Sequence, residues 1–84
     1  MFTIEIVGTT KSGCRVLTSK ALHVSSLSDA QVWARHEFDL ELHLAPYMGT
    51  SDAPAALVQV LRDGQVVWKL TQAERVLERR REPQ

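Results

Sequence analysis

This chain of 84 residues has little of what several protein classes require. Its one cysteine, Cys14, excludes a disulfide within the chain and fits a reducing compartment. No apolar run approaches the roughly 18–20 residues of a membrane-spanning helix. The first residues lack the basic segment and the small-residue cleavage site of a signal peptide. We therefore expect a cytoplasmic protein that contacts no membrane.

Net charge and known motifs are also missing. Ten acidic residues balance ten basic ones, so no net field attracts nucleic acid or an anionic surface. The sequence contains no P-loop, dinucleotide fingerprint, CxxC or zinc-protease motif. It assigns no catalytic residue, no metal ligand and no cofactor. A non-enzymatic protein is favoured over an enzyme.

The strongest local signal that is present is Asp63-Gly64, between two runs rich in β-branched residues. A type I′ turn needs φ > 0 at both positions, which Asp tolerates and Gly adopts freely, so we expect a hairpin. An unbroken register predicts the pairs Arg62–Gln65, Leu61–Val66, Val60–Val67, Gln59–Trp68 and Val58–Lys69. It also predicts two faces, an apolar one with Leu57, Leu61, Val66, Trp68 and Leu70 and a second one with Val58, Val60 and Val67.

The N-terminal third predicts another hairpin. Phe2, Ile4 and Ile6 alternate with other residues, which is typical of a strand with one buried face. The polar residues 9–13 predict a turn, and residues 14–24 a second, less regular strand. We expect a bulge near residues 18–20, where the alternation changes parity.

A long helix is expected next. Ser28-Asp29-Ala30-Gln31 reads as a capping box, and Leu27 and Val32 have the spacing of a hydrophobic staple. The apolar positions predict a helix over 28–44 that stops before Pro46.

Residues 38–44 also alternate as a strand would, and this alternative stays open. We expect Trp33 and Trp68 to be buried between the helix and the sheet.

The last quarter predicts a short helix after the second hairpin. Residues 47–54 are rich in turn formers and predict a loop. Thr71-Gln72-Ala73-Glu74 is a second capping box, and Arg79 to Arg81 suit the negative end of a helix dipole. Residues 82–84 are expected to be a frayed tail.

Together these elements predict one α+β domain over residues 1–84. The order is β-β-α-β-β-α, in a single antiparallel four-stranded sheet with strand order 2-1-3-4. The long helix covers one face of this sheet. The other face keeps exposed valines, so it needs the C-terminal helix or a partner to cover it.

Residues suited to chemistry have ordinary explanations. His36, Asp39 and His43 share a helix face, but their spacing matches no zinc motif and a solvated face explains them better. Cys14 has no neighbouring histidine to activate it. The Glu37–Glu41 pair suits the edge of a buried stripe better than acid–base work.

The pattern of an N-terminal hairpin, a capped helix with Ala30 and a closing hairpin with Val60, Asp63-Gly64 and Val67 resembles short uncharacterised β-β-α-β-β domains of proteobacteria. The resemblance implies a bacterial origin and this fold, but no function, since none is assigned to these domains.

We expect a protein-interaction or self-assembly domain, binding a protein partner or forming a homodimer. The alternative is a nucleic-acid accessory protein that uses the C-terminal arginines. The candidate partner-binding residues are Val58, Val60, Val67, Arg75, Arg79, Arg80 and Arg81.

Overall fold

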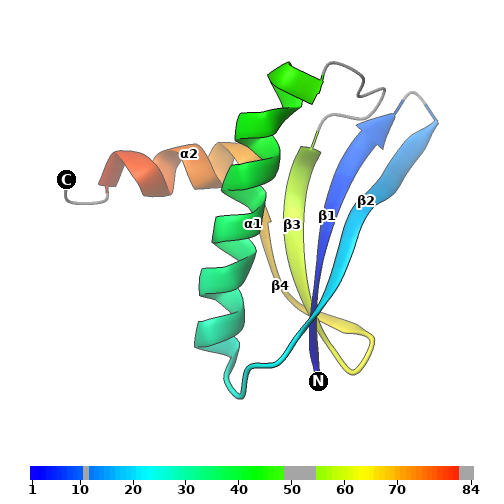
Figure 1. Ribbon diagram of the computed structural model, residues 1–84, viewed down its shortest axis with the longest axis vertical. Coiled ribbons are helices and arrows are strands. Elements are labelled where there is room, and N and C mark those ends of the chain that lie inside the picture. The colour runs from blue at the N-terminus through cyan, green and yellow to red at the C-terminus, as the bar shows by residue number, and fades with distance from the viewer. Residues whose placement is uncertain (11, 49–54, 82–84) are drawn as a thin grey trace.

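The computed structural model describes residues 1–10, 12–48 and 55–81. The predicted tail at 82–84 and most of the loop predicted at 47–54 lie outside these residues. Two hairpins flank a long helix, and a short helix follows the second hairpin (Figure 1). The elements are β1 (Phe2–Thr10), β2 (Gly13–Leu22), α1 (Leu27–Met48), β3 (Ala55–Arg62), β4 (Gln65–Thr71) and α2 (Gln72–Arg81).

The four strands form one antiparallel sheet in the order β2-β1-β3-β4, so the predicted α+β class and strand order are confirmed. The helix α1 returns the chain from the end of β2 to the start of β3. This crossover places β1 and β3 side by side at the centre, where both edges of each strand are hydrogen-bonded.

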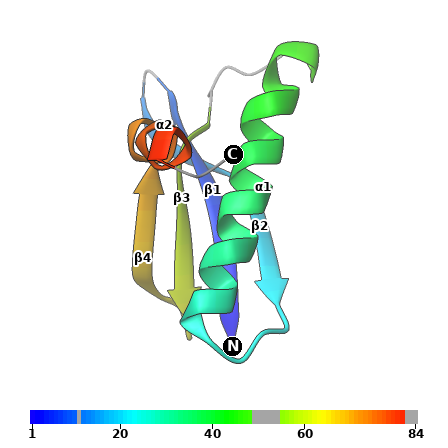
Figure 2. The same cartoon turned by 90° about the vertical axis from the view of Figure 1, so that its left-hand side faces the viewer.

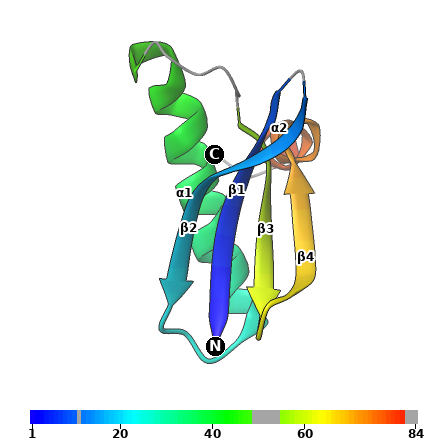
Figure 3. The same ribbon diagram turned by 90° about the vertical axis from the view of Figure 1, so that its right-hand side faces the viewer.

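Both helices lie on the same side of the sheet (Figures 2 and 3). On that side Ile4 and Ile6 of β1 pack with Val58 and Val60 of β3, and each is at most 1% exposed. From α1 the stripe Ala30, Ala34 and Phe38 enters this core with 0% exposure. The spacing of four residues keeps the stripe on one face of the helix.

The Asp-Gly turn forms as predicted, with φ of 52° at Asp63 and 84° at Gly64. The pairs Arg62–Gln65 and Leu61–Val66 are confirmed. Beyond them Val67 is an extra residue in β4, and the register shifts there by one position.

The shift makes the other predicted pairs wrong. Val60 pairs with Trp68 instead of Val67, Gln59 with Lys69, and Val58 with Leu70. A slip of one residue exchanges the faces of a strand, so Val58 and Val60 share the helix side with Trp68 and Leu70.

The predicted apolar face is therefore wrong as well, because Leu57, Leu61 and Val66 lie on the opposite side. In the first hairpin the irregularity lies at Leu17, between the pairs Ile6–Thr18 and Val7–Val16, and not at residues 18–20.

The cap of α1 is Ser26 and not Ser28. The Ser26 Oγ accepts a 3.2 Å hydrogen bond from the Asp29 amide, and its carbonyl accepts one of 3.1 Å from Ala30. Both serines are suited to cap a helix, and the earlier one adds a further half turn. The predicted staple is absent, since Leu27 is now the first helical residue and Val32 is 64% exposed.

The helix α1 also continues to Met48, so the predicted stop before Pro46 is wrong. Proline has a φ that suits a helix, and the one backbone hydrogen bond that it removes does not end α1 at this position. The segment 38–44 is helical, and the strand alternative is excluded. Phe38 at 0% exposure holds it against the sheet.

Candidate functional site

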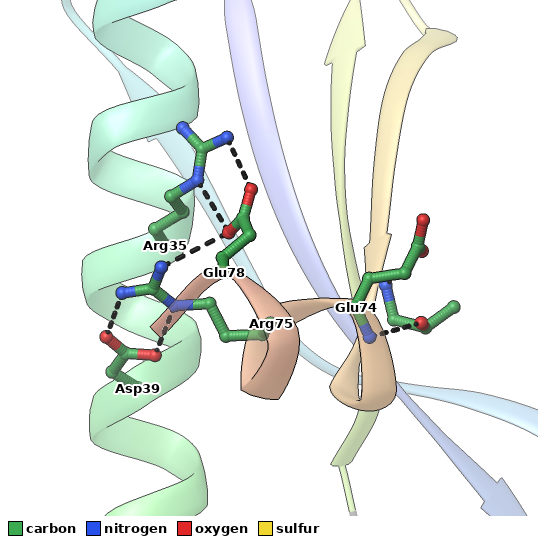
Figure 4. A network of polar contacts seen from close by, with 6 residues as sticks. Arg35, Asp39, Glu74, Arg75 and Glu78 are labelled. Carbon is green, nitrogen blue, oxygen red and sulfur yellow. Dashed lines mark hydrogen bonds and ion pairs between the residues drawn. The ribbon is translucent and has the colours of Figure 1, made fainter. Parts of the chain in front are cut away.

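The helix α2 is fixed at its start by a capping box that the sequence predicted correctly. The Thr71 amide donates to Glu74 Oε1 over 2.9 Å, and the Glu74 amide donates to Thr71 Oγ1 over 3.2 Å (Figure 4). The backbone hydrogen bond from Thr71 lowers the pKa of Glu74. Because this box begins at the last residue of β4, α2 leaves the sheet in a defined direction.

Four charged side chains then join α2 to α1. Arg75 binds Asp39 with two hydrogen bonds, from Nε to Oδ1 at 2.9 Å and from Nη2 to Oδ2 at 2.7 Å (Figure 4). Its Nη1 donates to Glu78 Oε1 over 3.2 Å. Arg35 donates to both Glu78 oxygens over 3.0 Å. We call these four residues the helix-junction network.

The charges of the helix-junction network cancel, and the arrangement favours the ionised forms. The hydrogen bond from Arg75 lowers the pKa of Asp39, although partial burial opposes this change. The hydrogen bond from Arg35 lowers the pKa of Glu78 in the same way. The Arg35 guanidinium also lies 5.1 Å from the Trp68 ring centre, which ties the network to the sheet.

The structure separates the predicted arginines into two groups. Arg75 is only 7% exposed and its fork is occupied by carboxylates, so it is not a phosphate ligand on the surface. Arg75 and Glu78 also form an ion pair at i,i+3 spacing within α2. Arg79, Arg80 and Arg81 are exposed on the end of α2, which extends beyond α1 (Figure 1).

The other chemical candidates do not converge. Asp39 binds Arg75, while His36 contacts the edge of the Trp33 ring at 6.2 Å between centres. In the described ranges no three His, Cys, Asp or Glu side chains are placed to share a metal ion. Glu37 pairs with Lys20 over 3.1 Å. Cys14 is exposed on β2.

The sheet face turned away from both helices carries residues that the sequence pattern assigned to the buried side (Figure 3). We call it the open face. Its side chains form three rows across the strands β2, β1, β3 and β4. In that order the first row is Ala21, Thr3, Leu61 and Val66, the polar middle row is Ser19, Glu5, Gln59 and Lys69, and the third row is Val16, Val7, Leu57 and Thr71.

The outer rows of the open face are apolar and partly solvated. Val16 is 48% exposed and Val66 is 46% exposed, while Leu57 and Leu61 are half-buried. The predicted residue Val67 is 43% exposed, but Val58 and Val60 are fully buried beneath α1 and cannot bind a partner. The prediction of an exposed apolar sheet face is therefore wrong for Val58 and Val60, and the apolar side chains partly exposed there include Val16, Leu57, Leu61 and Val66.

The polar middle row is organised by one hydrogen bond. Gln59 Nε2 donates to Glu5 Oε1 over 2.8 Å, and both side chains are half-buried. Beside this pair lies a shallow hollow of about 280 Å³ over the third row. It is lined by Val7, Cys14, Arg15, Val16, Leu57, Gln59 and Lys69.

The outward side of α1 is a second apolar surface. Trp33, predicted to be buried, is 45% exposed, and Lys20 Nζ lies 5.9 Å from its ring centre. Val32 and Leu40 are 64% and 41% exposed on the same helix. Trp68 is partly buried against the core, which agrees with its predicted position between the helix and the sheet. The apolar residues of α1 cover more of its surface than the buried stripe Ala30, Ala34 and Phe38, and this excess was the signal for an outer surface.

No family model, curated protein or solved structure matches the chain. The helices in the described residues lack the combination of length and hydrophobicity that crossing a membrane requires. The functional conclusion therefore rests on the surfaces described above.

Proposed function

We propose that this chain is a small non-enzymatic interaction domain that self-assembles through the open face. The observation that supports this most strongly is the position of both helices on one side of the sheet (Figures 2 and 3). Val16, Leu57, Leu61 and Val66 are thereby left in contact with solvent. They form two apolar groups, one on each side of the polar middle row, and grouped apolar side chains mark interaction sites more often than isolated ones do.

The net free energy expected from covering the open face is modest. Covering roughly 300 Å² of apolar surface on each copy, at about 25 cal/mol per Å², contributes about 15 kcal/mol for the two copies together. Association opposes this with about 4–15 kcal/mol of lost freedom. The two totals are comparable, so we expect an assembly that forms and dissociates with concentration.

The test is the solution mass of the purified chain over a wide concentration range, measured by sedimentation or light scattering. Val66→Lys places a charge on the open face and is expected to shift assembly to at least tenfold higher concentration. Val32→Lys is the matched control, because Val32 is 64% exposed on the outward side of α1. A wild-type monomer at every concentration, or equal effects of the two variants, would contradict the proposal.

The second candidate function is nucleic-acid binding by Arg79, Arg80 and Arg81. It is supported by their exposure on the projecting end of α2. The case for nucleic-acid binding is weakened because Arg75, the fourth predicted arginine, is hydrogen-bonded to Asp39. A salt titration with duplex and single-stranded DNA separates the two functions, because phosphate contacts give a steep loss of affinity with salt. Replacing the three arginines with glutamine should abolish that slope.

A further inference from the structure

We infer that the partner of the open face is a second copy of this chain, packed sheet on sheet about a twofold axis parallel to the strands. The inference rests on the proposed function and adds the geometry of the assembly. It is carried by the order of apolar and charged residues across the three rows of the open face.

An axis parallel to the strands keeps each row opposite the same row of the partner and reverses the strand order. In the polar middle row Glu5 then faces the partner's Gln59, and Lys69 faces the partner's Ser19. Glu5 also lies one strand away from the partner's Lys69, so opposite charges approach one another. The polar row meets a polar row, and no like charges are opposed.

The same operation matches the apolar rows. Leu57 faces the partner's Val7 in the third row. In the first row Val66 faces the partner's Ala21, so a larger side chain meets a smaller one. Val16 faces the partner's Thr71 and Leu61 faces the partner's Thr3, so two of the partly exposed apolar side chains meet threonines, and the outer rows of each copy are covered by the outer rows of the other.

The other twofold axis in the plane of contact, perpendicular to the strands, is disfavoured by charge. It keeps each strand opposite the same strand and exchanges the first and third rows. Glu5 would then face the partner's Glu5, and Lys69 the partner's Lys69. Two like-charge pairs in a covered interface make this arrangement unfavourable.

The area of the open face sets the expected affinity of the two copies for each other. Four strands about 4.8 Å apart, with about seven residues each at about 3.4 Å per residue, give a footprint of about 450 Å². A stable interface buries about 800 Å² on each partner, so the dimer is expected to be weak and to dissociate on dilution. The net charge of zero does not oppose it.

Chemical cross-linking distinguishes the two axes. In a Cys14→Ser background, the double variant Ala21→Cys, Val66→Cys is treated with an ethylene-bridged bis-maleimide. Ala21 and Val66 lie on the two edge strands, about 14 Å apart at three strand spacings, so the short linker does not join them within one chain. In the parallel-axis dimer each lies opposite the other across the interface.

The expected result is efficient dimer cross-linking in the double variant, and at least tenfold less in either single variant. Ser19→Cys in the same background reports the perpendicular axis, since only that axis places Ser19 opposite its own copy. Cross-linking through Ser19→Cys, with none in the double variant, would overturn the inferred geometry and leave self-assembly intact. A chain that stays monomeric and does not cross-link at all would overturn both.

Discussion

Replacing Asp39 with asparagine should destabilise the fold through one identified contact. Asp39 accepts two hydrogen bonds from Arg75, at 2.9 and 2.7 Å, and these join α1 to α2. Asparagine keeps the shape of the side chain, removes its charge and offers one acceptor oxygen instead of two. Arg75 is 7% exposed and retains Glu78 as a partner. The variant therefore loses only the charge and the acceptor oxygen that Asp39 contributes to the helix-junction network.

The magnitude follows from burial. Removing one partner of a fully buried ion pair costs about 3–5 kcal/mol. The Asp39 side chain is 29% exposed, so solvent reduces the effect towards the value of a hydrogen bond to a charged group, about 1.5–3 kcal/mol. We expect Asp39→Asn to lower the free energy of unfolding by about 2 kcal/mol.

Urea denaturation at neutral pH measures this value, with Asp29→Asn as the control. Asp29 is an exposed carboxylate in the first turn of the same helix, and its replacement should cost less than about 1 kcal/mol. A double-mutant cycle with Arg75→Met isolates the pair. A coupling energy near zero, or equal effects of the two Asp→Asn variants, would refute the role given to the helix-junction network.

The pH dependence provides a further prediction on the same residues. The pKa values of Asp39 and Glu78 are both lowered in the folded state. Their stabilising contributions are thus complete above the ordinary carboxyl pKa and are lost as pH falls through the lowered values. Below about pH 4.5 the wild type should lose stability more steeply than Asp39→Asn in urea titrations. Parallel curves would show that the pair does not couple folding to protonation.

Three other changes test the fold. Phe38→Ala removes the largest fully buried side chain and should lower the free energy of unfolding in urea by about 3–5 kcal/mol. Leu40→Ala, at a residue that is 41% exposed, should lower it by less than about 1 kcal/mol. Equal losses would mean that the core is misassigned. Thr71→Ala removes the cap of α2 and should cost about 1 kcal/mol, with faster hydrogen exchange in α2 and unchanged exchange in β1. Gly64→Ala forces a Cβ into a turn at φ 84° and should lower the thermal midpoint by several degrees, and an unchanged midpoint would contradict the type I′ turn.

Local signals in the sequence were sufficient for the architecture. The alternation of Phe2, Ile4 and Ile6, the Asp63-Gly64 turn and the capping box at Thr71 each depend on neighbouring residues alone. They predicted the strands, the second hairpin and the start of α2. The strand order followed from the helical crossover and from the apolar character of the two central strands.

The predictions are wrong at positions where contacts between residues far apart in the sequence determine the structure. The bulge at Val67 has no glycine or proline to mark it, and it follows from pairing Trp68 and Leu70 with the core valines. Two serines compete to cap α1, and the choice of Ser26 is not visible in the local pattern. The residue spacing on α2 gave no sign that Arg75 binds Asp39, which lies 36 positions earlier in the chain.

The central claim is that the open face mediates assembly, and a dilution series of methyl NMR spectra tests it most directly. Methyl signals of Val16, Leu57 and Val66 on the open face should shift with concentration, while those of Val32 on α1 and Leu77 on α2 stay fixed. All five carry methyl groups that retain some solvent access, so the comparison is balanced. Shifts confined to Val32 or Leu77, or no shift at the highest concentration, would contradict the account.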